Sequence, residues 1–233
     1  MSSDFRVLPL PQFVPEGLTV WDQVIAKKGH SHEVYQRGED FLKKGADKEI
    51  GGTAIWRQNV AFLCFQQAAL LDHAGAICKL GRYYLEGKIV DQSTEKAQTC
   101  FLHATAKNNA EAYYLLGVVW EKKIGGGISC SESLCYFDEA GKLGHVAALM
   151  RLAEIYDLGI EPVKQSDLTA FDYYKKAAQL GDGNAQFKTA EMLETGRGCR
   201  KSESDAQAWY KKAAEGKEKA LASKAAEDNQ GLF

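Results

Sequence analysis

The sequence predicts an all-α fold, an α-solenoid of about five helix-turn-helix repeats with helical caps at its ends. One observation is that small and bulky residues recur with a period of 36 residues over most of the chain. Another is that only four prolines occur in 233 residues, three of them before residue 16. Because proline breaks helix interiors, the remaining sequence permits long helices. Two helices of about a dozen residues each, with their turns, account for the period.

The first helix of each repeat is marked by an alanine that opens an apolar stretch. These alanines are separated by 36, 36 and 37 residues and are Ala76, Ala112, Ala148 and Ala185. A small residue follows five positions later, at Gly81, Gly117, Ala153 and Ala190. A bulky residue follows three positions after that, at Tyr84, Trp120, Tyr156 and Leu193. This pattern predicts one helix per repeat with a small-then-large face, usually ended by a glycine.

The second helix of each repeat is marked by an aromatic residue. These rings are Phe65, Phe101, Phe137, Tyr174 and Tyr210. An alanine follows each ring three positions later, at Ala68, Ala104, Ala140, Ala177 and Ala213. A small residue precedes each ring by four positions, at Ala61, Ala97, Ser133, Ala170 and Ala206. These spacings form one helical face, so we expect the rings to fill the gaps that the small residues leave.

The two ends of the array differ from the repeats. We expect residues 1–29 to form a proline-containing leader followed by a short helix, because residues 19–22 resemble a capping box. The array and its cap then occupy residues 30–233, with a degenerate opening helix over 32–44 and a polar capping helix over 217–228. The apolar segment 7–15 has two interpretations, docking on the array itself or on a partner.

Composition excludes several classes of protein. Lys and Arg number 29 against 31 Asp and Glu, for a net charge of −2, which disfavours a nucleic-acid binder. No apolar run approaches the roughly 20 residues of a membrane span, and no apolar segment of a secretory signal follows Met1. The six cysteines fit neither a disulfide scaffold nor a CxxC zinc site, namely Cys64, Cys78, Cys100, Cys130, Cys135 and Cys199. We therefore expect free thiols in a reducing intracellular compartment, cytoplasmic or mitochondrial.

Motifs for catalysis or metal binding do not emerge from the sequence. Residues 196–202 weakly resemble a phosphate loop, but Arg200 replaces the glycine before Lys201. His30 and His32 lack an evident third metal ligand. His73, His103 and His145 lie at or near expected helix ends, where solvated or capping roles are common. Two repeat positions that carry cysteine are predicted to be core positions, one shared by Cys64 and Cys100, the other by Cys78, Tyr114, Met150 and Phe187. The sequence thus predicts no enzyme, no cofactor and no metal site.

The repeat pattern resembles the Sel1-like repeat family, a relative of the tetratricopeptide repeat. The resemblance is carried by residues 170–181 followed by Ala185, by residues 205–214, and by residues 80–84 with Gly87. It extends well over residues 53–215 and loosely over 30–52. The resemblance implies a right-handed solenoid whose first helices line a concave face. The chain lacks the regular cysteine pair in each repeat of the secreted members, so their disulfides are not expected here.

By analogy with this superfamily, the groove positions lie one, four and five residues after the small residue. The candidate partner-binding residues among them are Arg82, Glu86, Glu121, Lys122, Glu154, Asp157, Glu191 and Glu194. The same positions also include Leu85, Val118, Leu158 and Thr195. Four carboxylates in the last two repeats predict a groove for a basic or amide-rich peptide. The competing interpretation is that these carboxylates are merely solvated.

The resemblance implies a protein-protein interaction scaffold, an adaptor or assembly factor that holds a partner in this groove. One alternative is a stoichiometric structural subunit of a larger complex, for which a mitochondrial complex is one option. A remote alternative is a small-molecule-binding or hydrolytic repeat protein. The sequence leaves the partner, the pathway and the oligomeric state open.

The ring position generates a first prediction. Phe101→Ala is expected to lower the free energy of unfolding by roughly 3–5 kcal/mol, as for other truncations of buried phenylalanine. Chemical denaturation followed by circular dichroism measures this loss. A loss well under 1 kcal/mol would mean that the ring does not face the core.

Overall fold

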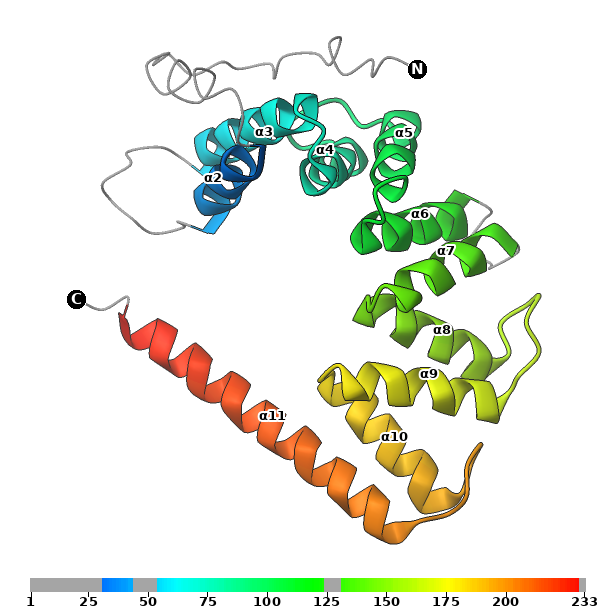
Figure 1. Ribbon diagram of the computed structural model, residues 1–233. Coiled ribbons are helices and arrows are strands. Elements are labelled where there is room, and N and C mark those ends of the chain that lie inside the picture. The colour runs from blue at the N-terminus through cyan, green and yellow to red at the C-terminus, as the bar shows by residue number, and fades with distance from the viewer. Residues whose placement is uncertain (1–30, 44–53, 124–130, 231–233) are drawn as a thin grey trace. The chain divides into compact units, whose positions relative to one another are not determined.

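The computed structural model of the chain describes residues 31–43, 54–123 and 131–230, without the side chains of residues 122–123 and 218–230 (Figure 1). This part of the chain contains ten helices and no strand, so the prediction of an all-α repeat fold is confirmed. The predicted leader and the short helix after it lie outside the described residues.

The helices follow one another as five hairpins. Their bounds are α2 Ser31–Lys43, α3 Ala54–Leu70, α4 Ala74–Glu86, α5 Thr94–Thr105, α6 Ala110–Lys123, α7 Ser131–Lys142, α8 Val146–Leu158, α9 Asp167–Gln179, α10 Gly183–Thr195 and α11 Glu203–Gln230. Contacts join α2 to α3, α4 to α5, α8 to α9 and α10 to α11. The chain divides into two compact units, residues 1–116 and 117–233, with the boundary inside α6.

Within three hairpins, a glycine on the first helix lies against a phenylalanine ring on the second. The pairs are Gly38 with Phe65, Gly81 with Phe101, and Gly117 with Phe137. A methyl group on Gly38 would lie 2.6 Å from Cε1 of Phe65, and one on Gly117 would lie 2.5 Å from Cε1 of Phe137. All three rings are fully buried. The predicted small-residue and ring positions therefore meet in the core.

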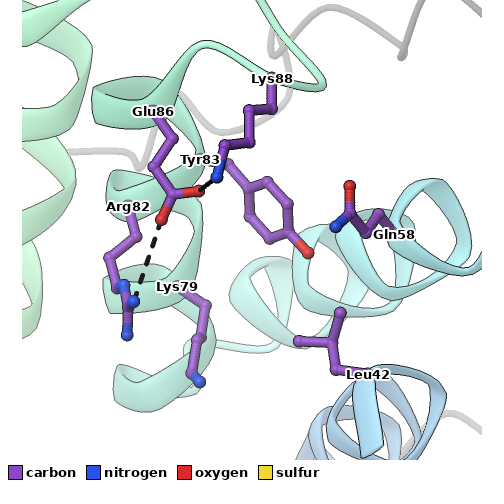
Figure 2. A pocket seen from close by; sticks show the side chains of 7 residues that line it. All are labelled: Leu42, Gln58, Lys79, Arg82, Tyr83, Glu86 and Lys88. Carbon is purple, nitrogen blue, oxygen red and sulfur yellow. Dashed lines mark ion pairs between the residues drawn. The ribbon is translucent and has the colours of Figure 1, made fainter. Parts of the chain in front are cut away.

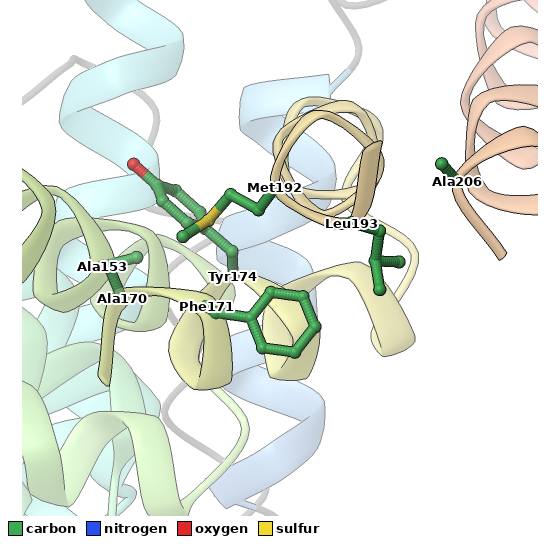
Figure 3. Close-up of a cluster of buried hydrophobic side chains, with 7 residues drawn as sticks. All are labelled: Ala153, Ala170, Phe171, Tyr174, Met192, Leu193 and Ala206. Carbon is green, nitrogen blue, oxygen red and sulfur yellow. The ribbon is translucent and has the colours of Figure 1, made fainter. Parts of the chain in front are cut away.

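In the last two hairpins, alanine replaces the glycine and tyrosine replaces the phenylalanine. Ala153 and Tyr174 belong to one buried cluster of the second unit with Ala170, Phe171, Met192, Leu193 and Ala206 (Figure 3). Tyr210, on the last helix, is only half-buried. The exchange of glycine for alanine is thus accompanied by a ring that carries a hydroxyl group.

The turns between hairpins share a motif of two residues. The first residue has a positive φ, at Asp72, Asn108, Gly144 and Gly181. The next residue caps the following helix through its side chain, at His73, Asn109, His145 and Asp182. Each cap accepts a hydrogen bond, at 2.7–3.2 Å, from the backbone N–H of Ala76, Ala112, Ala148 or Ala185. The recurring alanines are therefore the capped residues. Of the two expected roles, His73 and His145 take the capping one, whereas His103 lies in the last turn of α5.

The last helix differs from the sequence prediction. A separate helix was expected over residues 217–228, but α11 runs without a break from Glu203 to Gln230. Lys217 and Glu218 occupy the positions where the other repeats place the positive-φ residue and the cap. Lysine does not favour a positive φ and glutamate is a weak cap, so the helix continues.

The close glycine contact generates a second prediction. Gly81→Ala is expected to destabilise the protein by about 1–3 kcal/mol, because the buried Phe101 ring leaves no space for a methyl group. The matched control is Gly216→Ala in α11, where a methyl group would meet no atom within 4 Å. There the exchange should stabilise the helix by about 0.5–1 kcal/mol. Equal shifts in the unfolding free energy of the two variants would contradict the close contact.

The cap at His73 generates a third prediction. Its Nδ1 accepts the Ala76 N–H at 3.2 Å, which requires this nitrogen to be unprotonated. Burial, and then the nearby His32, lower the pKa of His73 below its usual value. The unfolded chain therefore binds this proton more readily, and stability should fall as the pH drops below about 6.5.

His73→Asn supplies the control, because Asn109 forms the same cap without titrating. Between pH 7.5 and 5.5, we expect the unfolding free energy of the natural protein to fall by about 1 kcal/mol more than that of the variant. Parallel stability profiles would show that the charge state of His73 does not matter.

Candidate functional site

A groove with a volume of about 570 Å³ lies in the second unit. Helix α8 contributes Met150, Glu154, Asp157 and Leu158, and helix α10 contributes Asn184, Phe187 and Lys188. Tyr174 of α9 and Lys217 of α11 complete the lining. The groove therefore combines apolar side chains, carboxylates and ammonium groups from four helices.

Helical periodicity explains why these side chains face the groove. The four residues of α8 are spaced i, i+4, i+7 and i+8, which places them on one face of the helix. The three residues of α10 are likewise spaced i, i+3 and i+4. The opposite face of α8 holds the buried Leu152, and the opposite face of α10 holds the buried Leu193. The repeat pattern thus sets which side of each helix lines the groove.

The two carboxylates of α8 are each paired with an arginine, one on α8 itself and one from a distant part of the chain. Arg151 donates to Glu121 from Nε at 3.1 Å and from Nη2, and its Nη1 lies 3.0 Å from Glu154. Asp157 accepts hydrogen bonds from Arg197 at 2.7 Å and from the Tyr174 hydroxyl at 3.4 Å. The Asp157 side chain is only 12% exposed. Burial, and then the charge of Asp157, raise the pKa of Tyr174.

The four carboxylates predicted in the last two repeats divide between two environments. Glu154 and Asp157 line the groove, whereas Glu191 and Glu194 do not. Glu191 lies 3.0 Å from the ammonium of Lys188, which does line it. Glu194 accepts a hydrogen bond of 2.9 Å from the Tyr210 hydroxyl. Each of the four therefore already has a partner within the chain.

The candidate residues of the first unit lie beside a smaller groove of about 170 Å³. Figure 2 shows that Glu86 reaches both Arg82, at 3.9 Å, and Lys88, at 3.2 Å. Arg82 also lies 3.6 Å from Glu111. Lys122 belongs to α6, but its side chain lies outside the described residues. Charges in this groove are thus arranged as internal ion pairs around the Tyr83 ring.

One prediction about the core is wrong. Phe187 occupies the repeat position of Cys78 and was expected to be buried, yet it is 48% exposed while Cys78 is 3% exposed. The thiol is small enough to be enclosed at this position, whereas the phenyl ring of Phe187 extends into the groove. There its centroid lies 5.3 Å from the centroid of the Tyr210 ring. Tyr114 and Met150, at the same repeat position, are half-buried, so the size of the side chain alone does not predict the exposure of Phe187.

Three cysteines of the first unit are buried in the core. Cys64, Cys78 and Cys100 are buried free thiols, and burial raises the pKa of Cys64 to about 11 and those of the other two to about 12. Within the described ranges, no group of three or more metal-ligating side chains is present. In the same part of the chain, no helix is both long and apolar enough to cross a membrane.

Comparison with known proteins identifies relatives in sequence and structure. The chain is 28% identical to the chitin synthase regulator SKT5 of Saccharomyces cerevisiae, in an alignment that is 257 residues long. This match covers 90% of the chain but 36% of the regulator, so the chain spans about a third of that protein's length.

Two solved structures share the fold. A Sel1 repeat protein from Oxalobacter formigenes is 25% identical with a TM-score of 0.66, over 79% of this chain and 72% of that one. The uropathogenic Escherichia coli antigen c5321, which displays an SLR fold, is 21% identical with a TM-score of 0.67, over 84% of this chain and 40% of that one.

A family model specifies the repeats. The Sel1 repeat model matches residues 58–73, 74–109, 146–182 and 183–217, which together make up more than half of the chain. The boundaries fall at the turns before α4 and α10, where His73 and Asp182 cap the next helix. The period of the repeats, the helices that they form and the match to the family model together show that the chain belongs to the Sel1 repeat family.

Proposed function

We propose that this chain is a protein-interaction module, an adaptor or assembly factor. It holds a partner protein against the first helix of successive repeats. The observation that carries the proposal is the groove of about 570 Å³ with apolar side chains exposed inside it. A hollow that combines apolar surface with a few polar groups is typical of a binding site. The sequence-predicted residues Glu154 and Asp157 lie in that hollow.

The relation to a chitin synthase regulator supports a regulatory form of this role. The similarity extends over 90% of this chain. We infer that the chain, in the same way, binds a partner enzyme and adjusts its activity or assembly, without performing a reaction of its own. The reducing intracellular compartment, cytoplasmic or mitochondrial, remains our expectation from the cysteines.

The charged residues of the groove serve specificity in this proposal. Glu121, Glu154 and Asp157 already make internal ion pairs, so a basic partner group must compete with Arg151 or Arg197. Charges arranged in this way steer association and reject wrong partners more than they add affinity. We propose that Arg82 and Glu86 in the first unit, and Lys122 on α6, also steer association and reject wrong partners.

A stoichiometric subunit of a larger complex is the second candidate. Leu143 and Leu180 are exposed at equivalent positions, just after α7 and α9, away from the groove. Repeated exposed leucines are suited to a permanent contact with another subunit. A subunit would be recovered at a fixed ratio that survives high salt, whereas an adaptor complex should be salt-sensitive.

The proposal generates a fourth prediction. A photo-crosslinking amino acid at Asn184, which lines the groove, should attach a partner protein in native extract. The same amino acid at Asp172, exposed on α9 outside the groove, should not. Combined Glu154→Lys and Glu191→Lys substitutions should weaken the Asn184 crosslink without altering the melting temperature. Crosslinking that is equal at both positions, or absent from both, would contradict a partner in this groove.

A further inference from the structure

We infer that the groove of the second unit recognises an extended partner segment in which a large apolar residue and a Lys or Arg are two positions apart. The basic residue faces Glu154, and the apolar residue packs on the apolar side chain one helical turn away, Leu158 or, in the opposite chain direction, Met150. This inference rests on the proposed function and specifies the chemistry of the partner.

The apolar part of the groove is the first argument. Leu158 is 70% exposed, and Phe187 is 48% exposed although its repeat position buries Cys78. Both line the same hollow, together with the half-buried Met150. Its volume of about 570 Å³ lies within the roughly 300–1,000 Å³ of ligand pockets. A large apolar side chain of a partner would remove this exposed surface from water.

The accessible charge in the groove is the second argument. Glu154 lies one helical turn from both Met150 and Leu158 and is 45% exposed. Asp157 is less accessible, because Tyr174 and Arg197 already satisfy it. Arg151 divides its donors between Glu121 and Glu154, which leaves Glu154 able to accept another hydrogen bond. The groove therefore offers an accessible carboxylate in the middle of an apolar stripe.

For an extended partner, the spacing of that stripe sets which residues of the partner can contact it. Residues four apart on a helix surface have Cβ atoms about 5–6 Å apart. In an extended segment, alternate side chains point to the same side and are separated by about 6.5 Å. An apolar and a basic residue two positions apart therefore match Leu158 and Glu154. They match Met150 and Glu154 in the opposite chain direction.

An acidic segment fits the groove less well. It would place its carboxylates near Glu154 and Asp157. Of the two lysines in the lining, Lys188 is already paired with Glu191 at 3.0 Å, and Lys217 alone faces two carboxylates.

In the described part of the first unit, the smaller groove of about 170 Å³ has one exposed large aliphatic side chain, Leu42, beside three cations, Lys79, Arg82 and Lys88. Recognition of an apolar and basic pair therefore fits the second unit better.

The test uses the full chain to select from a displayed library of random 12-residue peptides. We expect enriched peptides to share a large apolar residue two positions from Lys or Arg. Leu158→Ser should weaken binding of the synthetic consensus peptide about tenfold or more, as measured by fluorescence anisotropy. The matched control is Leu168→Ser on α9, because Leu168 is 64% exposed but does not line the groove.

The charge is tested in the same way. Glu154→Gln should reduce affinity severalfold and lower the salt dependence of binding. Glu139→Gln is its control, because Glu139 on α7 is 49% exposed and lies outside the groove. Each glutamate forms an ion pair with a cation three residues away on its own helix. The two variants therefore remove the same type of contact and differ in whether the residue lies in the groove.

Three results would overturn the inference: no enriched peptide, enriched peptides without the apolar and basic pair, or equal losses for Leu158→Ser and Leu168→Ser. Melting temperatures of all variants verify folding. Crosslinking from Asn184 separates this inference from the proposed function. If a partner crosslinks there while the peptide result is negative, the function stands and the partner chemistry is wrong. If crosslinking is also absent, both are wrong.

Discussion

The close approach of the two helices within a hairpin is the constraint on which the rest of the structure depends. The ring of Phe101 packs on the backbone of α4 at Gly81, and Phe137 packs on α6 at Gly117 in the same way. A side chain at either glycine would occupy the space of a fully buried ring. Because protein interiors are close-packed, the ring has no room to move away. The glycine and ring together therefore fix the separation and rotation of the two helices.

That rotation also determines what the groove contains. Because the buried Leu152 and Ala153 of α8 face the core, Glu154 and Leu158 lie on the other side of the helix. Asp157 lies one turn after Ala153, at the border between the core and the groove. In the last two hairpins the ring is a tyrosine, and its hydroxyl reaches a carboxylate four residues after the small residue, Asp157 or Glu194. The buried ring and the charged surface are thus connected by one side chain. Packing in the core holds part of the candidate site in place.

Local sequence signals explain the turns, including the one that does not form. Asn and Asp at the positive-φ and capping positions are residue types that favour those roles, and glycine favours the positive φ. Lys217 and Glu218 stand at the corresponding positions after the last ring, and α11 continues through them. The repeat period predicts a turn at these two positions, but the two residues themselves favour a helix. Their identity therefore indicates the single helix of 28 residues that the structure shows.

The sequence by itself determined the repeat period, the helices, and the register that places Gly81 and Phe101 in the core. These features follow from helical periodicity and local conformational preference, which act between residues close in the chain. Only the tertiary structure decided that Arg151 pairs with Glu121, 30 residues away, and Arg197 with Asp157, 40 residues away. It also decided that Phe187 faces the groove. These outcomes depend on side-chain size and on the distance between neighbouring helices, which a periodic pattern does not encode.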